Sequence, residues 1–307
     1  MTTEIETVAP TNLAISLRGV CKSYKHFALK DIHLSLERGT VAGLIGPNGA
    51  GKSTTMRILM GLIQPDRGSV TVLDKPISSS DAAAKQDIGY FAEDMRLYKP
   101  ESIRWHMQFV RSLYPTWDDV YAGQLMERFG LIDRQLVKGL SHGQRVKAML
   151  LLILARRPKL LILDEPTNGL DPVAKHEVIA ELMRVVEDPE RTILYSSHNT
   201  QDVEQISDSI TFIDRGQVIA SNNRYDFIEK WKRITLHASD SWSVPTVDGL
   251  RLESTFRSLR VLSTDQFQED LSERLRASGA TLETIEPMTL EEIFVSVVMR
   301  GREGSQS

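Results

Sequence analysis

The stretch that decides the fold is "VAGLIGPNGAGKSTTMRILMGLI", residues 41–63. Its first part, "VAGLIG", is an apolar run that ends in glycine, which is typical of a short buried strand. Its last part, from Lys52 to Ile63, predicts a helix. The residues between the two match G-x-x-x-x-G-K-[ST], beginning at Gly46 and ending at Ser53. A glycine-rich turn that leads from a strand into a helix predicts a phosphate-binding loop.

The chemistry of this loop follows from its backbone. Glycines let the chain curl until successive N–H groups point into one cavity, and the helix start adds its positive end. We expect Lys52 to reach the β- and γ-phosphate oxygens, Ser53 to ligate Mg²⁺ and Thr54 to lie on the α-phosphate side. A glycine-rich turn with an incidental lysine is the alternative, and the strand-then-helix context disfavours it. The loop residues predicted to bind a nucleotide are Asn48, Gly49, Ala50, Gly51, Lys52, Ser53 and Thr54.

Two later apolar runs, "KLLILDEP" (159–166) and "TILYSSH" (192–198), predict buried parallel strands. Ligands collect at the carboxyl ends of such strands, so we expect Asp164 to hold Mg²⁺ through water. Glu165 is placed to take a proton from an attacking water; a simple capping role for this acid pair is the alternative. His198 is interpreted as a neutral sensor of the γ-phosphate or the water, and a purely structural histidine remains the competing interpretation.

The rest of the pattern predicts an α/β domain with a mainly parallel sheet. Residues 14–40 alternate between apolar and polar, as antiparallel strands do, whereas residues 94–155 are helical in pattern. Within that helical part, "PTWDDVYAGQLMERFG" predicts a helix with Thr116 as its N-cap and Gly130 as its stop. Residues 209–221 predict a hairpin centred on Arg215 and Gly216.

A small α+β appendage is predicted at residues 226–307. Its role stays open between support of a dimer, sensing of a ligand and shielding of a surface. The helix from residue 288 should begin with a Thr-x-x-Glu cap, and the last residues, 301–307, should fray. The expected strands lie at 231–239, 250–256 and 259–264, and the expected helices at 265–279 and 288–300.

The composition excludes some classes of protein. The chain has 307 residues, 41% of them hydrophobic, and a net charge of −4, so its surface as a whole does not attract nucleic acid. The single cysteine, Cys21, favours a reducing compartment. The apolar runs fall far short of the roughly 20 residues that span a bilayer, and residues 1–14 show no apolar leader. We therefore expect any membrane role to come from a partner.

"LSHGQ", residues 140–144, predicts a second anion site. Ser141 and the amides of Gly143 and Gln144 stand at a predicted helix N-terminus, where backbone N–H groups are available to an anion. One nucleotide already has its phosphate loop. The additional site is explained if it faces the γ-phosphate bound to another copy of the domain.

The identity of the base is less directly encoded. Tyr24 precedes the phosphate loop and is a candidate to stack on a base; an ordinary core or surface aromatic is the alternative. The motif Asn-Lys-x-Asp, which reads a guanine edge, is absent from the sequence. The sequence thus favours adenine as the base.

Five motifs, "GPNGAGKST", "LSHGQ", "LLILDEP", "TNGLD" and "SSH", resemble the Walker A, signature, Walker B, D-loop and H-switch of the ATP-binding cassette (ABC) proteins, in the same order. The resemblance covers residues 13–225. It implies a P-loop NTPase core of the RecA-like kind, an antiparallel β subdomain and a helical insertion at about 94–155. It also implies that two cassettes pair head-to-tail around two ATP molecules, with Asp171 reaching across the interface.

Two residues depart from the family pattern. His142 stands where the signature usually has glycine, and Glu93 stands where a loop glutamine usually contacts the nucleotide. Glu93 can still ligate Mg²⁺ or bind the water. Both departures, together with "YPTWDD" and "PMTLEEIF", resemble the bacterial ABC-2-type exporter subfamily, which includes the YtrB-like group.

The resemblance favours an ATP-hydrolysing subunit of a bacterial exporter, at the cytoplasmic face of the inner membrane. It would act with a separate transmembrane permease and a second ABC subunit; because all catalytic elements are present, a homodimer suffices. A soluble cassette ATPase acting on nucleic acid or ribosomes is the alternative, although no nucleic-acid partner is expected; Glu165 argues against a non-hydrolysing assembly protein. The helical part carries aromatics that either line a groove for a partner's helix or form its own core: Tyr98, Trp105, Phe109, Tyr114, Trp117 and Tyr121.

Overall fold

The computed structural model describes residues 12–77 and 85–304. The predictions for the first eleven residues and for the last three lie outside these ranges. The described residues up to Ser207, together with Ile213–Val218, form one compact unit; Asp208–Phe212 and the described residues from Ile219 onward form a second. This division falls within strands β9 (Ser209–Asp214) and β10 (Gln217–Asn223), which form the predicted hairpin. The predicted boundary at residue 225 remains a prediction.

A six-stranded sheet with the order β10-β9-β3-β8-β7-β6 carries the phosphate loop. Four of its strands are parallel neighbours: β3 (Val41–Ile45), β8 (Thr192–Ser197), β7 (Leu160–Asp164) and β6 (Ile88–Phe91). Every residue of β3, β7 and β8 is buried, which explains why β3 and most of β7 and β8 are apolar; the polar residues of these strands, Asp164, Thr192, Ser196 and Ser197, are buried as well. The α/β class with a parallel core sheet is therefore confirmed.

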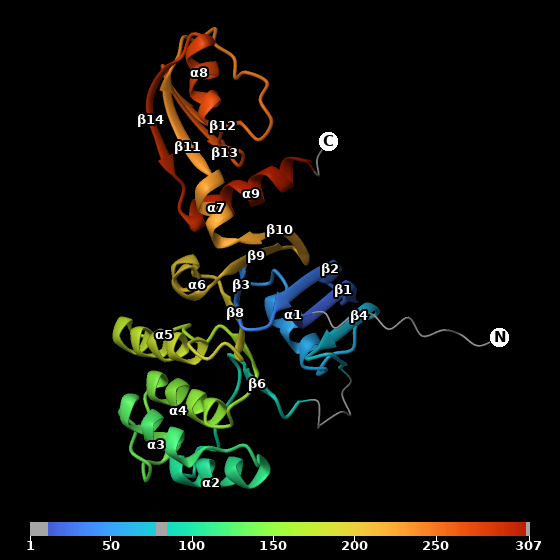
Figure 1. Ribbon diagram of the computed structural model, residues 1–307, viewed down its shortest axis with the longest axis vertical. Coiled ribbons are helices and arrows are strands. Elements are labelled where there is room, and N and C mark those ends of the chain that lie inside the picture. Colours follow the sequence, from blue (N-terminus) through green and yellow to red (C-terminus); the bar gives the residue numbers. More distant parts are fainter. Residues whose placement is uncertain (1–11, 78–84, 305–307) are drawn as a thin grey trace, which may run out of the picture. The chain divides into compact units, whose positions relative to one another are not determined.

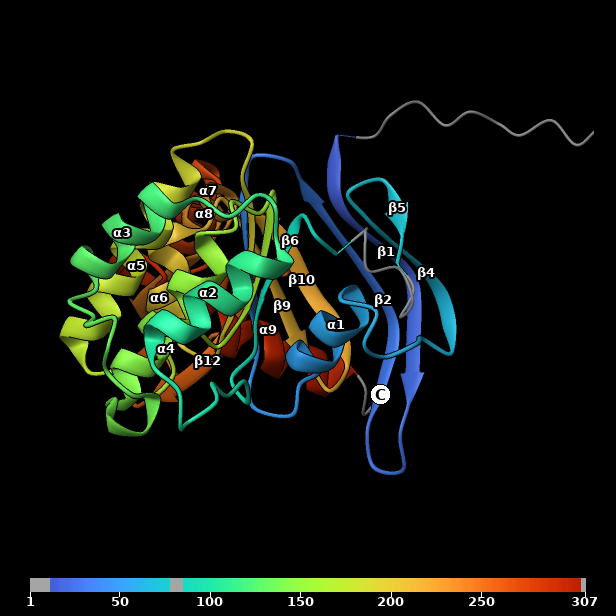
Figure 2. The ribbon, with the colours of Figure 1, turned by 90° about the horizontal axis from the view of Figure 1, so that it is seen from below.

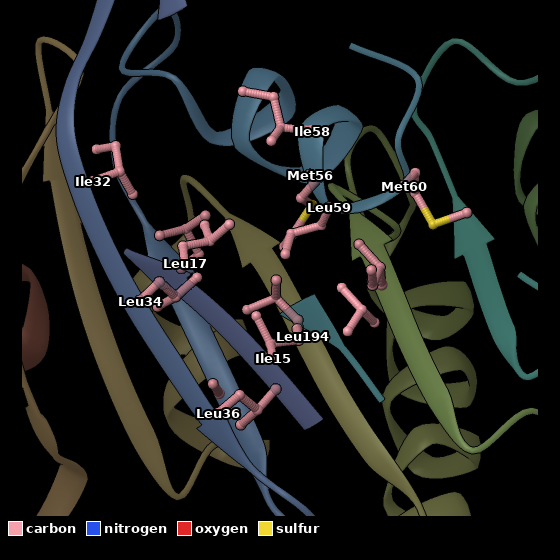
Figure 3. Packing of buried hydrophobic residues seen from close by; sticks show 14 of the residues in the cluster. Ile15, Leu17, Ile32, Leu34, Leu36, Met56, Ile58, Leu59, Met60 and Leu194 are labelled. Carbon is pink, nitrogen blue, oxygen red and sulfur yellow. The ribbon is translucent and has the colours of Figure 1, made fainter. Parts of the chain in front are cut away.

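A second, antiparallel sheet has the order β2-β1-β4-β5. It consists of β1 (Leu13–Ser23), β2 (Ala28–Glu37), β4 (Arg67–Val72) and the short β5 (Lys75–Pro76). Helix α1 (Lys52–Leu59) shares a hydrophobic cluster with this sheet and with β8. The side chains drawn in Figure 3 include Ile15, Leu17, Ile32, Leu34, Leu36, Met56, Leu59 and Leu194.

Apart from α1, the helices of the first unit gather on the side of the parallel sheet away from β1, β2 and β4 (Figures 1 and 2). None of the helices within the described ranges combines the length and apolar character needed to cross a bilayer. The helices on that side of the parallel sheet are α2 (Ile103–Leu113), α3 (Asp119–Arg128), α4 (His142–Leu154), α5 (Pro172–Val186) and α6 (Thr200–Ile206), with a short 3-10 turn at Val137–Gly139.

The predicted N-cap of α3 is wrong. Asp118, not Thr116, caps this helix, because its carboxylate accepts a hydrogen bond from the Tyr121 amide at 2.9 Å. The Thr116 hydroxyl instead donates to the carbonyl of Arg156 at 2.8 Å. The predicted stop is confirmed, since Gly130 takes a left-handed φ of 60° just beyond the helix end.

The aromatics of the helical part divide between its core and its surface. Tyr121 is only 7% exposed, whereas Tyr98 is 61%, Phe109 50% and Trp105 38% exposed. The Trp105 and Phe109 rings stack with centroids 5.3 Å apart. Tyr121 therefore belongs to the core of the helical part, whereas Tyr98, Trp105 and Phe109 lie on its surface; a groove for a partner's helix remains a prediction.

The second unit contains an antiparallel sheet with the order β12-β13-β11-β14. Helix α8 packs on one face through Leu271 and Leu275, whereas on the opposite face Ser263 hydrogen-bonds Ser296 of α9. The predicted cap is confirmed by hydrogen bonds in both directions between Thr289 and Glu292. The elements are α7 (Arg224–Lys230), β11 (Lys232–His237), β12 (Arg251–Phe256), β13 (Leu259–Thr264), α8 (Glu269–Ala277), β14 (Thr281–Pro287) and α9 (Leu290–Gly304).

Candidate nucleotide site

The phosphate loop joins β3 to α1 and takes the backbone shape that its glycines allow. Gly49 has a φ of 80° and Gly51 a φ of 116°, both in the range that favours glycine. The loop borders a cavity of about 370 Å³. Among the predicted loop residues, Ala50 is buried and does not border it. The cavity is lined by His26, Phe27, Pro47, Asn48, Gly49, Gly51, Lys52, Ser53, Thr54, Glu93 and Glu165.

The β9–β10 turn contacts the phosphate loop and holds its backbone in place. The Gly216 amide donates to the carbonyl of Ala50 at 2.9 Å, and the Gly216 carbonyl accepts from the Lys30 amide at 2.8 Å. Gly216 has a φ of 75°, and a Cβ added there would lie 1.8 Å from the carbonyl oxygen of Ala28. Only glycine fits this position, so the predicted Arg215-Gly216 hairpin has a role in shaping the phosphate site.

Lys52 lies at the centre of the site and is almost fully buried. Its Nζ donates to the carbonyl of Gly46 at 2.6 Å and to that of Pro47 at 3.3 Å. The same Nζ lies 3.1 Å from Oε1 of Glu165. The ammonium group is thus surrounded by oxygens, which phosphate oxygens of a nucleotide would replace.

Glu165 directly follows β7 and has a left-handed φ of 52°, which is costly for a residue with a side chain and is typical of functional sites. Its Oε2 contacts Nδ1 of His198 at 2.8 Å. Its buried Oε1 accepts no hydrogen bond from the described residues and has only the ionic contact with Lys52. The structure therefore brings together the three predicted catalytic residues.

Asp164 and Ser53 form the candidate metal site. The Ser196 hydroxyl donates to Asp164 at 2.7 Å, and the Ser53 hydroxyl also hydrogen-bonds this carboxylate. Burial raises the pKa of Asp164, while the two hydroxyls act in the opposite direction. A hydroxyl and a carboxylate that lie beside a phosphate pocket are hard oxygen donors of the kind that Mg²⁺ prefers. Among the described residues, no set of three or more acidic, histidine or cysteine side chains forms a metal site made by protein alone.

Glu93 lies in the loop after β6 and lines the same cavity. Its Oε1 accepts a hydrogen bond from Nδ2 of Asn168 at 2.7 Å. The side chain therefore reaches the nucleotide pocket and is also held by the segment that follows Glu165.

Tyr24 lies in the tight turn between β1 and β2, where its amide donates to the carbonyl of Phe27 at 2.7 Å. The ring is 46% exposed and lies 6.4 Å from the Phe27 ring. His26 and Phe27, rather than Tyr24, line the cavity. Sequence reasoning missed these two residues, although they belong to the same turn; an adenine-stacking role for Tyr24 remains a prediction.

The predicted second anion site is a well-formed helix N-terminus. Ser141 caps α4 by accepting from the Gln144 amide at 3.2 Å, and Gln144 Oε1 accepts in return from the Ser141 amide at 2.9 Å. Space at Gly143 is limited, since a Cβ there would lie 3.2 Å from the Ala174 side chain. Asp171 caps α5, and the hydrogen bond from the Ala174 amide leads the effects that lower the pKa of its carboxyl group.

A phosphate loop at the end of one parallel strand and a metal-binding carboxylate with a neighbouring base at the end of another define a P-loop nucleotide hydrolase. Comparison with known proteins narrows the class. Residues 29–168 match the ABC transporter family. The chain is 27% identical over 290 residues to the ABC transporter ATP-binding protein YtrB of Bacillus subtilis, covering 92% of this chain and 97% of YtrB.

The chain is also 35% identical over 223 residues to the lantibiotic transport ATP-binding protein SrtF of Streptococcus pyogenes, covering 72% of this chain and 95% of SrtF. A solved ATP-binding subunit of an ABC transporter superimposes with a TM-score of 0.64 at 25% identity, over 70% of this chain and 91% of that one. The chain belongs to the ABC transporter family, as one of its ATP-binding and ATP-hydrolysing subunits.

Proposed function

We propose that this chain is the nucleotide-binding subunit of a bacterial exporter. It binds ATP with Mg²⁺, pairs head-to-tail with a second copy of itself and drives a separate transmembrane permease. It lies at the cytoplasmic face of the inner membrane, where the permease holds it. The relatives named as transport proteins support the exporter class.

One observation carries the pairing. The cavity at the phosphate loop is lined by Lys52 and Glu165, but by none of residues 140–144, as far as the described residues show. The Ser141 turn nevertheless presents the amides of a helix N-terminus, which attract anions. One chain therefore contributes two anion sites: the phosphate loop borders one cavity and His142 of the Ser141 turn borders another, while Glu93 and Glu165 line both. A head-to-tail pair gives each γ-phosphate a phosphate loop from one copy and a signature turn from the other.

The chemistry follows from the contacts around Glu165. When phosphate oxygens engage Lys52, its ammonium group leaves the Glu165 carboxylate, which becomes free to accept a proton from water. His198 keeps that carboxylate oriented through its 2.8 Å contact. The amides of the phosphate loop and of the opposite signature turn stabilise the charge that develops on the γ-phosphate. When the γ-phosphate is lost, its contacts with the signature turn of the opposite copy are lost as well, and the two copies separate.

Ser53 and Asp164 would hold Mg²⁺, with Glu93 at the edge of the same pocket. The ion would neutralise charge on the phosphate oxygens. The Ser53 hydroxyl hydrogen-bonds the Asp164 carboxylate, so the two candidate metal ligands lie next to each other.

A permease contact is supported by the surface of the helical part. Tyr98, Trp105 and Phe109 are exposed together, and a stacked aromatic pair is a common anchor for a partner protein. The net charge of −4 gives the alternative, action on nucleic acid or ribosomes, no electrostatic support.

Mixing two inactive variants tests the pairing. Lys52→Ala removes the phosphate loop's cation, and Ser141→Arg blocks the signature turn, so each variant alone should hydrolyse little ATP. In a mixed pair, one site combines the intact phosphate loop of one copy with the intact signature turn of the other. Random mixing should restore about a quarter of the parent rate, since half of the pairs are mixed and each keeps one of two sites. No recovery would contradict a shared site.

Isolation with a six-span membrane protein encoded beside this chain would support the exporter assignment. Isolation of the tagged chain with ribosomes or nucleic acid instead would support the alternative. The Trp105→Ala/Phe109→Ala double variant should lose the membrane protein while its ATPase activity in the absence of that protein stays within about twofold of the parent value.

A further inference from the structure

Asn168 connects three functional segments of one chain. It lies in the turn between β7 and α5, three residues after the general base, and its amide donates to the carbonyl of Glu165 at 3.2 Å. Its side-chain Nδ2 donates to Oε1 of Glu93 at 2.7 Å. Its carbonyl lies 3.0 Å from Nε2 of His142, the third residue of the signature turn (140–144).

Both residues that depart from the family pattern thus contact the same asparagine. A carbonyl oxygen only accepts, so Nε2 of His142 must carry a proton and donate to it. Glycine at position 142 would have no side chain to make this contact. The neighbouring Gly169 lies beside the imidazole, and its left-handed φ of 69° favours glycine there; a Cβ would lie 3.4 Å from Nε2, at van der Waals contact.

Only one end of this connection borders the phosphate loop. Glu93 lines the cavity of that loop together with Lys52 and Glu165. His142 does not line it; it lines a second cavity of about 570 Å³ together with Asn168, and Glu93 and Glu165 line this second cavity as well. The side chain of Asn168 contacts the first end and its backbone contacts the second, so the connection is continuous through one residue.

We propose that Asn168 is a positioning residue that transmits the state of the chain's own nucleotide pocket from Glu93 to His142 and the signature turn. This inference rests on the proposed function, in which that turn contacts the nucleotide of the second copy. It assigns His142 a role within its own chain, as the donor that fixes the signature turn to the segment after Glu165.

The test uses the full-length chain with histidine side chains labelled with ¹⁵N, and MgADP as the probe. MgADP fills the chain's own pocket but lacks the γ-phosphate that closes a pair. The His142→Gln variant identifies the His142 resonance by its disappearance. MgADP should shift this resonance in the parent protein and should leave it nearly unshifted in Asn168→Ala, which keeps the backbone but loses the contact with Glu93.

Matched variants distinguish loss of the Glu93–Asn168 contact from a general disturbance of the structure. Glu93→Gln keeps an oxygen that can accept from Asn168 and should keep the shift, whereas Glu93→Ala should lose it. His176→Gln alters an exposed histidine of α5 and should change nothing. MgADP affinity is measured for each variant. An equal shift in Asn168→Ala and the parent, at equal MgADP occupancy, would overturn the proposal.

Steady-state kinetics provide the second readout. Asn168→Ala and His142→Gly should each lower kcat about tenfold while KM for ATP stays within about twofold, which a loss of nucleotide binding would not produce. His142→Gln retains a side-chain donor and should recover most of kcat. An unchanged kcat in both weakened variants would also overturn the proposal. If the Glu165→Gln variant forms no dimer in the presence of MgATP, the proposed function is contradicted. The MgADP experiment is made on single chains, so it tests the connection through Asn168 independently of that outcome.

Discussion

Replacing Glu165 with glutamine removes the proton-accepting charge of the proposed general base while it keeps the shape of the side chain. The amide has the shape of the carboxylate, and its oxygen can still face His198, which lies 2.8 Å from Oε2 in the parent. The proton-accepting charge is lost. A positioned general base contributes about 100- to 10,000-fold to a rate, so kcat should fall by that factor, equivalent to about 3–5 kcal/mol.

The same variant should bind ATP more tightly. In the parent, Lys52 lies 3.1 Å from Oε1 of Glu165, and two unit charges at that distance attract by about 5 kcal/mol at an effective dielectric constant of 20. Desolvation offsets much of this attraction. Because ATP no longer has to displace the carboxylate, its dissociation constant should fall by about tenfold or more.

The assays are phosphate release under saturating MgATP and equilibrium binding of ATP. Glu190→Gln, an exposed charge removal in the loop before β8, is the matched control and should behave as the parent does. A Glu165→Gln protein that turns over within about threefold of the parent would refute the base assignment. Weaker ATP binding in that variant would refute the competition between Glu165 and phosphate for Lys52.

Three further results are expected. Lys52→Ala should raise the dissociation constant for ATP by about 10- to 150-fold in equilibrium binding, since it removes charge-assisted hydrogen bonds; unchanged affinity would contradict its role. Tyr121→Phe should lower the free energy of unfolding in urea by about 1–3 kcal/mol, because the Tyr121 hydroxyl donates to buried Glu181 at 3.0 Å; an equally stable variant would show that this bond is dispensable. Asp118→Ala should cost about 1 kcal/mol as a lost helix cap. The hydrogen bond from the Tyr121 amide leads the effects that lower the pKa of Asp118, so its contribution is present above the ordinary pKa of 3.8 and is lost as the pH falls through the lowered value. Urea titrations should therefore show the difference from the parent shrinking in acid, and a difference that does not depend on pH would contradict this cause.

The parts of the fold that were predicted are those with strong local signals. Strand β3 and the apolar parts of β7 and β8 could be predicted, because both faces of the parallel sheet are covered and such strands consist mainly of apolar residues. The phosphate loop was predicted because its spacing is dictated by backbone geometry. Strand β14 was missed, because most of its residues are exposed and its pattern is that of an edge strand.

The parts that were missed depend on contacts between distant segments. Two capping candidates precede α3, and the choice of Asp118 over Thr116 depends on the Arg156 carbonyl, which occupies the threonine hydroxyl. Likewise, no local pattern relates Glu93 to Asn168, which are 75 positions apart. Sequence reasoning named most residues that line the phosphate-loop cavity but missed His26 and Phe27, and the contacts between these residues are set by the tertiary structure.

The turn at Gly216 has a consequence for how the protein is made. The ribosome synthesises the phosphate loop early, yet the Ala50 carbonyl finds its hydrogen-bond partner only at Gly216. Gly46, at the start of the loop, is packed against Ile213 in the same late segment. A nascent chain that ends before this hairpin therefore lacks the segment that contacts Ala50 and Gly46 of its phosphate loop. We expect such a chain to bind ATP only after roughly the first two thirds of the polypeptide have left the exit tunnel.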